Sequence, residues 1–265
     1  MPGILLRIPY IQNKVSEVAT TQLSGHLGVP VKIGNVDIEW FNRLVLEGLY
    51  LEDQDGKVMF EANHVAAGFE IMPLLEGKFV FTTVRLFGFS FNLRKHTPES
   101  PLNLQFVIDA FASKDSIKKE KNIDLRFNSI MIRRGNFSYN VDSEKETPGK
   151  FNAKHIDIKN LSAKISLKAF NKDSVNAHIK KMSFDEASGF SLNKLSLNVV
   201  GNRDSAFVQD FEVRLPQTNL KIGRARIDLS EIDSLPALLN NAPIDLNITP
   251  SQICLKDLSP FVPAF

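Results

Sequence analysis

The residues of this chain that could perform chemistry are few and widely spaced. Its 265 residues include five histidines, but none stands four residues from another or close to the single cysteine, Cys254. Such spacing does not favour a metal site. Gly88 and Gly189 each begin a Gly-x-Ser sequence, but asparagine, at Asn92 and Asn193, replaces the glycine that closes a nucleophile elbow. We therefore expect no enzyme activity, no metal and no cofactor.

Two further groups of charged residues have simpler interpretations. Asp53 and Asp55 carry carboxylates that could bind a cation, but the sequence from Asp53 to Gly56 is typical of a turn. Arg133 and Arg134 could contact an anionic head group, although a solvated strand edge is the favoured interpretation. The formal net charge is only +2, which does not predict nucleic-acid binding.

Most of the chain has the apolar–polar alternation of β-strands with one apolar face. Phe87, Phe89 and Phe91 alternate with glycine and polar residues, and the region after residue 123 shows the same pattern repeatedly. One amphipathic helix is predicted over residues 9–27. A second, shorter helix is predicted over 103–111, with Asn103 as its N-cap.

The alternation repeatedly slips by one residue. Ile130 and Ile132 follow Phe127 out of phase, and the strand that begins at Leu161 follows Ile158 out of phase. A slip turns side chains to the other face unless a bulge or bend absorbs it. The pattern therefore predicts an elongated, curved antiparallel sheet that forms a groove, with one or two short helices. A compact β-sandwich is the alternative.

The composition limits the remaining classes of protein. Hydrophobic residues make up 43% of the chain, which argues against disorder and against a chain embedded in a membrane throughout. Aromatic usage is uneven, with 20 Phe against 3 Tyr and 1 Trp, and Phe supplies apolar area without a polar atom. A single cysteine excludes an internal disulfide. The sequence contains no complete signal peptide and no apolar run of the roughly 20 residues that a membrane span needs.

Several segments, in order, resemble the TamB-like proteins of the AsmA-like superfamily, in particular those of Bacteroidota. The sequence LLRIPYIQ at residues 5–12 resembles the junction that follows their inner-membrane anchor. The stretch from Trp40 to Asp53, which contains LEGLYLED, is similar to the N-terminal signature of the superfamily, as is PLLEG at residues 73–77 followed by VRLFG at 84–88. The sequence NLQFVIDAF at residues 103–111 is similar to a helix of TamB-like proteins.

The resemblance implies an organisation and a cellular setting. It divides the chain into an N-terminal module (1–112), a linker (113–122) and a repeated β-strand groove (123–265) that is truncated at the C-terminus. It implies a bridge-like lipid-transfer protein of the periplasm, anchored in the inner membrane by a segment missing from this chain. Phospholipid and an outer-membrane Omp85-class protein, TamA or a related barrel-assembly protein, are the implied partners, and no nucleic acid is expected.

Two functions follow as expectations. The first is a non-enzymatic component of a translocation and assembly module, which shields phospholipid acyl chains in an apolar groove during outer-membrane biogenesis, supports outer-membrane protein assembly and secretion, or does both. The second is a scaffold that binds unfolded β-barrel or autotransporter clients by strand addition. For each groove candidate, ordinary core packing is the competing interpretation. The candidates are Phe87, Phe89, Phe91, Phe127, Phe137, Tyr139, Ile165, Leu167, Phe184 and Phe190.

Overall fold

The structure is a computed structural model that describes residues 9–39, 42–70, 72, 79–111, 123–170, 174–202, 204–228 and 244–262. The helices are α2 (Pro9–Leu27) and α4 (Gln105–Phe111), and a short 3-10 helix spans Leu255–Leu258. The strands are β1 (Val31–Lys32), β2 (Asn35–Glu39), β3 (Arg43–Glu52), β4 (Val58–Phe69), β5 (Phe79–Lys95), β6 (Ile123–Val141), β7 (His155–Phe170), β8 (Ser174–Glu186), β9 (Ser191–Asn202), β10 (Ser205–Arg214), β11 (Asn219–Asp228) and β12 (Ile244–Ile248).

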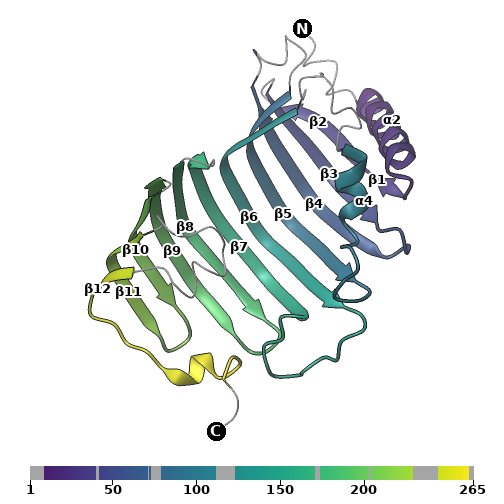
Figure 1. Cartoon of the computed structure of the whole chain (residues 1–265). Coiled ribbons are helices and arrows are strands. Elements are labelled where there is room, and N and C mark those ends of the chain that lie inside the picture. Colours follow the sequence, from purple (N-terminus) through teal and green to yellow (C-terminus); the bar gives the residue numbers. More distant parts are fainter. Residues whose placement is uncertain are drawn as a thin grey trace.

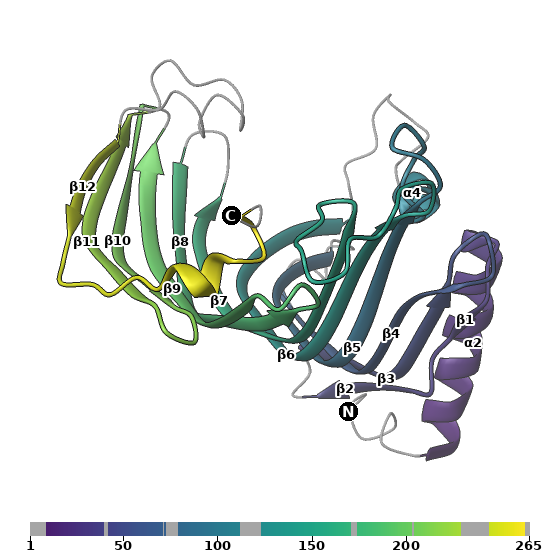
Figure 2. The ribbon, with the colours of Figure 1, turned by 90° about the horizontal axis from the view of Figure 1, so that it is seen from below.

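These strands belong to one sheet of 12 strands (Figure 1). Its order is β1-β3-β4-β5-β6-β7-β8-β9-β10-β11-β12, and β2 also pairs with β3. Seen from below, the sheet curves into an open U whose two ends stand apart (Figure 2). The predicted curved, mainly β fold with an N-terminal helix is confirmed. Because the described strands form one sheet and not two packed sheets, the β-sandwich alternative is wrong for this part of the chain.

One pair of strands departs from the predicted antiparallel arrangement, because β5 and β6 run parallel. A parallel pair needs a long crossover connection, and here the connection between the two strands contains α4. Alternation within a strand carries no information about strand direction, so the sequence pattern could not show this. The pairing also joins the two predicted regions, 1–112 and 123–265, in one sheet, while the predicted linker (113–122) lies outside the described residues.

The phase slips of the sequence coincide with a row of unusual backbone conformations across the sheet. Gly48 in β3, Gly88 in β5, Arg134 in β6, Asn160 in β7 and Asp210 in β10 all have positive φ, between 52° and 62°. Each of them stands where the apolar alternation of its strand changes phase. A left-handed residue in a strand is typical of a β-bulge, which bends the strand and increases its twist. Register shifts accompany Arg134, Asn160 and Asp210, whereas the pairing around Gly48 and Gly88 stays in register. We name the five positions together the line of bulges; the slip between Phe127 and Ile130 has no such residue.

The pairing of β6 with β7 shows what such a bulge does to the side chains. Ile132 pairs with Ala163 and Gly135 pairs with Leu161, so three steps along β6 match two steps along β7. Ala163 and Leu161 are alternate residues of β7 and therefore lie on one face. Because paired residues share a face, their partners Ile132 and Gly135 lie on that face too, and the extra residue in β6 makes this possible. Apolar side chains before and after the slip therefore lie on one side of the sheet.

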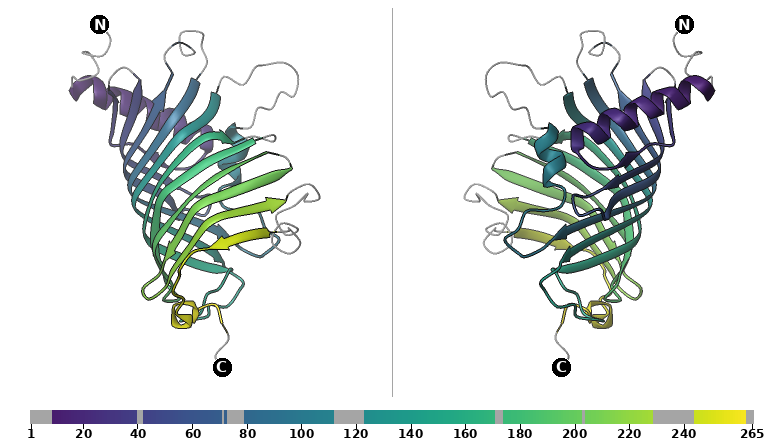
Figure 3. Two further views of the ribbon diagram at one scale, coloured as in Figure 1. Left: turned by 90° about the vertical axis from the view of Figure 1, so that its left-hand side faces the viewer. Right: turned by 90° about the vertical axis from the view of Figure 1, so that its right-hand side faces the viewer.

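Helix α2 lies along the first strands of the sheet (Figure 3). Its bounds, Pro9–Leu27, are those predicted from the sequence. The Ser24 hydroxyl exchanges hydrogen bonds with the backbone of Val31, at 3.0 and 3.2 Å, and the backbone N–H of Ile33 donates to Thr20 Oγ1 at 3.2 Å. Leu23 and Leu27 pack against a small core around Val31, Ile33 and Val36. The helix thus covers the edge strand and satisfies part of its backbone.

Helix α4 begins later than predicted, at Gln105, and Asn103 has a different role from the predicted N-cap. The Asn103 side-chain oxygen accepts a hydrogen bond from the backbone N–H of Arg94 at 3.0 Å, and its amide donates to Asp53 and to the Asn92 carbonyl. Asn103 therefore ties the segment before α4 to the end of β5. At the other end of this helix, His26 Nε2 lies 2.9 Å from the carbonyl oxygen of Ala110, which links α4 to α2.

Candidate functional site

The candidate site is a continuous apolar surface that crosses the sheet from β3 to β11. Strand pairing places nine apolar side chains side by side in one row, and their partners in adjacent strands are fixed by the register. We name the side of the sheet that carries this row the apolar face and the opposite side the polar face. In strand order the row consists of Leu46, Val65, Leu86, Ile132, Ala163, Met182, Leu195, Val213 and Leu220.

The apolar face is only partly shielded from solvent in the described part of the chain. Ala163 is 5% exposed, and the other members of the row are half-buried. Because all described strands belong to a single sheet, no second sheet packs on this face, as it would in a sandwich. Large side chains with less than 2% exposure are limited to Met59 and Val141 among the described residues. Leu46 packs against the core that α2 covers, and from Val65 to Leu220 no second sheet of the described part of the chain covers the row.

Aromatic rings enlarge the apolar face in the part of the sheet that follows Gly88 in β5 and Arg134 in β6. The Phe60 ring lies 6.2 Å from Phe89 and 5.7 Å from Phe91, and Phe91 lies 6.2 Å from Phe137, all measured between ring centroids. Phe89 is 6% exposed because its ring covers Gly135, where a Cβ atom would come within 2.3 Å of it. Glycine at position 135 therefore allows this ring to lie flat over β6.

Six of the sequence candidates lie on this face within regular strands, and a seventh extends it. Register and bulge positions place Phe89, Phe91, Phe137, Tyr139, Ile165 and Leu167 on the side of Leu86 and Ile132. Phe184 shares the face of Met182, two residues earlier in β8. The side chain of Phe127 lies outside the described residues. Their position on the face agrees with the proposed groove but does not test binding.

Phe190 lies just before β9 and belongs to an aromatic cluster with the C-terminal segment. Its ring centroid is 6.1 Å from that of Phe184 and 5.0 Å from that of Phe261. Phe261 also lies 4.9 Å from Phe151, whose backbone N–H donates to the Pro260 carbonyl at 2.9 Å. This contact packs the residues after the 3-10 helix against the β8–β9 turn.

Phe87 is the candidate that the structure places elsewhere. It pairs with His64 in β4 and Arg133 in β6, and its side chain is 40% exposed beneath the Arg134 guanidinium. The prediction that Phe87 shares a face with Phe89 is wrong, because Gly88 between them has φ +60° and the bulge reverses the alternation. Phe87 therefore lies on the polar face.

Sequence reasoning missed all nine members of the row, Leu86 and Ile132 among them, and Phe60 of the aromatic group. Each belongs to an alternating pattern, so its strand and its apolar side were visible in the sequence. Selection by a single alternation leaves out the apolar residues beyond each phase slip. The sequence does not show that the apolar side chains before and after a slip lie on the same face of the sheet. Only the register shows that the members of the row pair with one another across the strands and that Phe60 pairs with Phe91.

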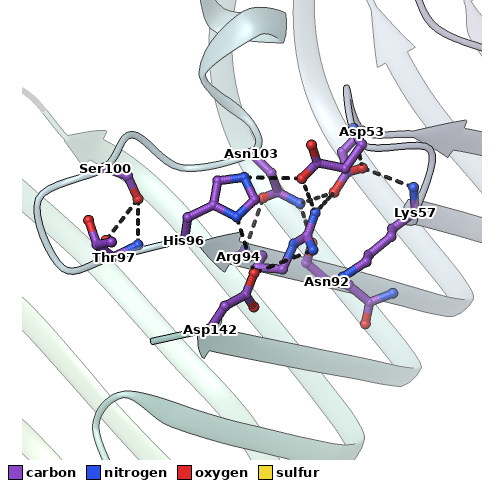
Figure 4. Close-up of polar contacts among 10 residues, drawn as sticks. Asp53, Lys57, Asn92, Arg94, His96, Thr97, Ser100, Asn103 and Asp142 are labelled. Carbon is purple, nitrogen blue, oxygen red and sulfur yellow. Dashed lines mark hydrogen bonds and ion pairs between the residues drawn. The ribbon is translucent and has the colours of Figure 1, made fainter. Parts of the chain in front are cut away.

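The densest group of charged side chains lies at the ends of β3, β5 and β6 (Figure 4). Arg94 Nη2 lies 3.2 Å from Asp53 Oδ2, contacts Asp55, and its Nη1 lies 3.5 Å from Asp142. His96 bridges Asp55 and Asp142, at 3.2 Å from each. The backbone N–H groups of Asp55 and Lys57 donate to Asp53 Oδ1 within the predicted turn, which is confirmed.

These partners make the Asp53 group structural rather than reactive. Burial by itself would raise the pKa of Asp53, whose side chain is 2% exposed. The hydrogen bonds from Asn103 and the Lys57 backbone, together with the Arg94 charge, outweigh burial and hold the pKa below its usual value. A carboxylate held in its charged form by this many donors fastens the segment before α4 to the sheet. It is poorly suited to accept a proton from a substrate.

The chain matches no protein-family model and no curated protein. The fold itself defines its class, a single-layer, open β-sheet with a continuous apolar face and an N-terminal helix along its first strands. Within the described ranges, no helix is both long and apolar enough to cross a membrane.

Proposed function

We propose that this chain is a non-enzymatic lipid-binding conduit whose apolar face shields phospholipid acyl chains from water. The observation that carries the proposal is the uninterrupted apolar row, which from Val65 to Leu220 is half-buried except at the buried Ala163 and has no second sheet over it in the described part of the chain. Exposing one CH₂ group to water costs about 0.8 kcal/mol, so an acyl chain of about sixteen carbons costs roughly 13 kcal/mol. A continuous apolar surface lowers that barrier without any chemical step.

The length of the surface suits transfer over a distance greater than one lipid. Adjacent strands lie about 4.8 Å apart, so the eight spacings between β3 and β11 correspond to a track of roughly 40 Å. The resemblance to TamB-like proteins supplies the setting for this proposal. In that setting the chain works in the periplasm, anchored to the inner membrane in the full-length protein, with an outer-membrane Omp85-class partner during outer-membrane biogenesis.

The experiment compares two neighbouring positions of β7 that face opposite ways. Ile165 pairs with Ile130 and Ile179 on the apolar face, whereas Ser166 pairs with Ser129 and His178 on the polar face. Purified wild-type protein is expected to carry phospholipid that organic extraction and mass spectrometry detect. Ile165→Asp places a charge in the acyl-chain path and should reduce the bound lipid by at least about tenfold, whereas Ser166→Asp should leave it unchanged. Equal lipid in both variants, or none in the wild type, would refute the proposal.

A second function is favoured by one observation, the exposed strand β12 at the end of the described sheet. It pairs with β11 alone among the described strands, and its Leu246 and Ile248 side chains are 47% and 59% exposed. An unpaired edge of this kind can add a strand from another chain. Photoreactive groups in β12 that capture unfolded β-barrel clients would support a scaffold for outer-membrane proteins. Capture of lipid alone would count against it.

A further inference from the structure

A hollow on the polar face gathers four cationic side chains around an apolar floor. It has a volume of about 450 Å³ and lies where β5, β6, β7 and β8 cross the line of bulges. Its cations come from three neighbouring strands, and the Ser162 hydroxyl adds a polar group. The side chains that matter for its chemistry are Phe87, Met131, Arg133, Arg134, Lys164 and Lys181.

Strand pairing explains why the charges are concentrated here. Arg85 pairs with Met131, Met131 with Lys164, and Lys164 with Lys181, so one row of the polar face crosses four strands with three cations. Among the described residues that line the hollow, none carries a carboxylate. Among the described residues, Arg133, Lys164 and Lys181 have no side-chain hydrogen bond or ion pair. Because these like charges repel one another without a partner in the described chain, an anion from outside would be bound favourably among them.

The floor of the hollow is apolar and accessible. Phe87 is 40% exposed, and the Arg134 guanidinium carbon lies 5.5 Å from the centre of its ring. An exposed aromatic ring surrounded by Lys and Arg is typical of surfaces that bind the interface of an anionic membrane, where cations meet phosphates and the ring enters the head-group region. A small free anion would gain no binding energy from contact with the apolar floor.

We propose that the polar face docks on an anionic phospholipid bilayer through this hollow. The phosphate-bearing head groups contact Arg133, Arg134, Lys164 and Lys181, and Phe87 inserts between them. Ile132 and Ala163 of the apolar row also line the hollow, but strand pairing places Lys164 and Lys181 on the polar face. Docking on a membrane surface requires the cations and Phe87 and does not require lipid on the apolar face. The proposal therefore stands independently of the lipid-conduit function.

The test is sedimentation of the purified chain with lipid vesicles at about 0.1 M salt, where the screening length is about 10 Å. Vesicles of phosphatidylcholine with about 30% phosphatidylglycerol should bind the protein, and vesicles of phosphatidylcholine alone should not. Removing two cations with Lys164→Gln and Lys181→Gln should weaken binding roughly 25-fold, since each basic residue near the surface contributes about fivefold. The matched control is Lys150→Gln with Lys256→Gln, which changes the net charge equally at exposed positions away from the hollow.

Two further variants separate membrane docking from other sources of binding. Arg133→Lys keeps the charge and should retain binding, whereas Phe87→Ala should weaken it severalfold, and circular dichroism checks that each variant is folded. Equal loss of binding in the Lys150/Lys256 control would reduce the proposal to net charge and overturn it. Displacement by millimolar inorganic phosphate at constant ionic strength would assign a small-anion site instead. Binding of polyglutamate as tight as that of the vesicles would assign an acidic protein partner.

Discussion

The two faces of the sheet are built from the same strands, yet one carries a continuous row of apolar side chains and the other carries a cluster of cations. Phe87 and Phe89 are two residues apart in β5, but Phe89 is 6% exposed against other rings and Phe87 is 40% exposed beneath an arginine. The polar face places Arg85, Lys164 and Lys181 in water, whereas the row behind them is apolar from β3 to β11. A one-layer sheet can therefore carry a continuous apolar row on one face and a cluster of cations on the other, with no second sheet over the row in the described part of the chain.

The largest effect that sharpens this comparison is expected at the two phenylalanines. Phe89→Ala should lower the free energy of unfolding by about 4 kcal/mol, because it removes a buried ring and leaves a cavity beside Phe60. Phe87→Ala should cost less than about 1 kcal/mol, since an exposed ring loses little burial. Denaturant unfolding of both variants measures the difference. Similar losses in the two variants would contradict the assignment of the rings to opposite faces.

A smaller loss is expected when the charged group at the strand ends is broken. Asp53→Ala should lower the free energy of unfolding by about 3 kcal/mol, because it leaves Arg94, which is 12% exposed, and Asn103 without their buried partner. Thermal unfolding measures the loss, and Asp142→Ala, at a side chain that is 39% exposed, is the control with a small expected effect. A neutral Asp53→Ala would show that apolar packing alone holds this end of the sheet.

The same carboxylate gives stability a dependence on pH. Because the pKa of Asp53 is lowered in the folded state, its contribution is complete above the ordinary value of 3.8 and is lost as the pH falls below it. The wild type should therefore lose more stability than Asp53→Ala between about pH 4 and pH 2. Parallel pH profiles for the two proteins would show that Asp53 does not carry this contribution.

The smallest effect in this series concerns the bulge that separates the two faces. Gly88 has φ +60°, so Gly88→Ala should cost about 1–2 kcal/mol, because an L-residue is strained in the left-handed region. The matched variant is Asp210→Gly at φ +53°, at an exposed side chain, which should be neutral or slightly stabilising. Urea unfolding compares the two. A neutral Gly88→Ala would mean that the bulge is not fixed by this residue and that the strand can shift its phase.

Much of the architecture was predictable because it follows from local patterns. The stripe of apolar residues between Pro9 and Leu27 predicted α2 with its bounds, and the phase slip between Ile158 and Leu161 marked the bulge at Asn160 before any register was known. The face of Phe87 was not predictable in the same way. The sequence shows that apolar residues stand at 86, 87, 89 and 91, but it does not show where the alternation changes face. The left-handed backbone of Gly88 decides that Phe87 and Phe89 lie on opposite faces.

The rest of the site depends on contacts between distant segments. The parallel pairing of β5 with β6 results from a crossover connection, which no alternation pattern encodes. Asn103 has the residue type of a helix cap, but the free backbone N–H of Arg94 and the carboxylate of Asp53 lie within reach and take its side chain instead. Likewise, the row from Leu46 to Leu220 exists only through pairing between strands, so the sequence showed its members and not their continuity.

The most direct test of the central claim is photocrosslinking at two adjacent positions of β9 that lie away from the basic hollow. Leu197 pairs with Ile179 on the apolar face, and Asn198 pairs with His178 and Gln209 on the polar face. A photoreactive phenylalanine derivative at position 197 is expected to capture phospholipid in intact cells, and the same group at 198 is not. Equal capture at both positions, or capture at 198 alone, would contradict an apolar face that carries lipid.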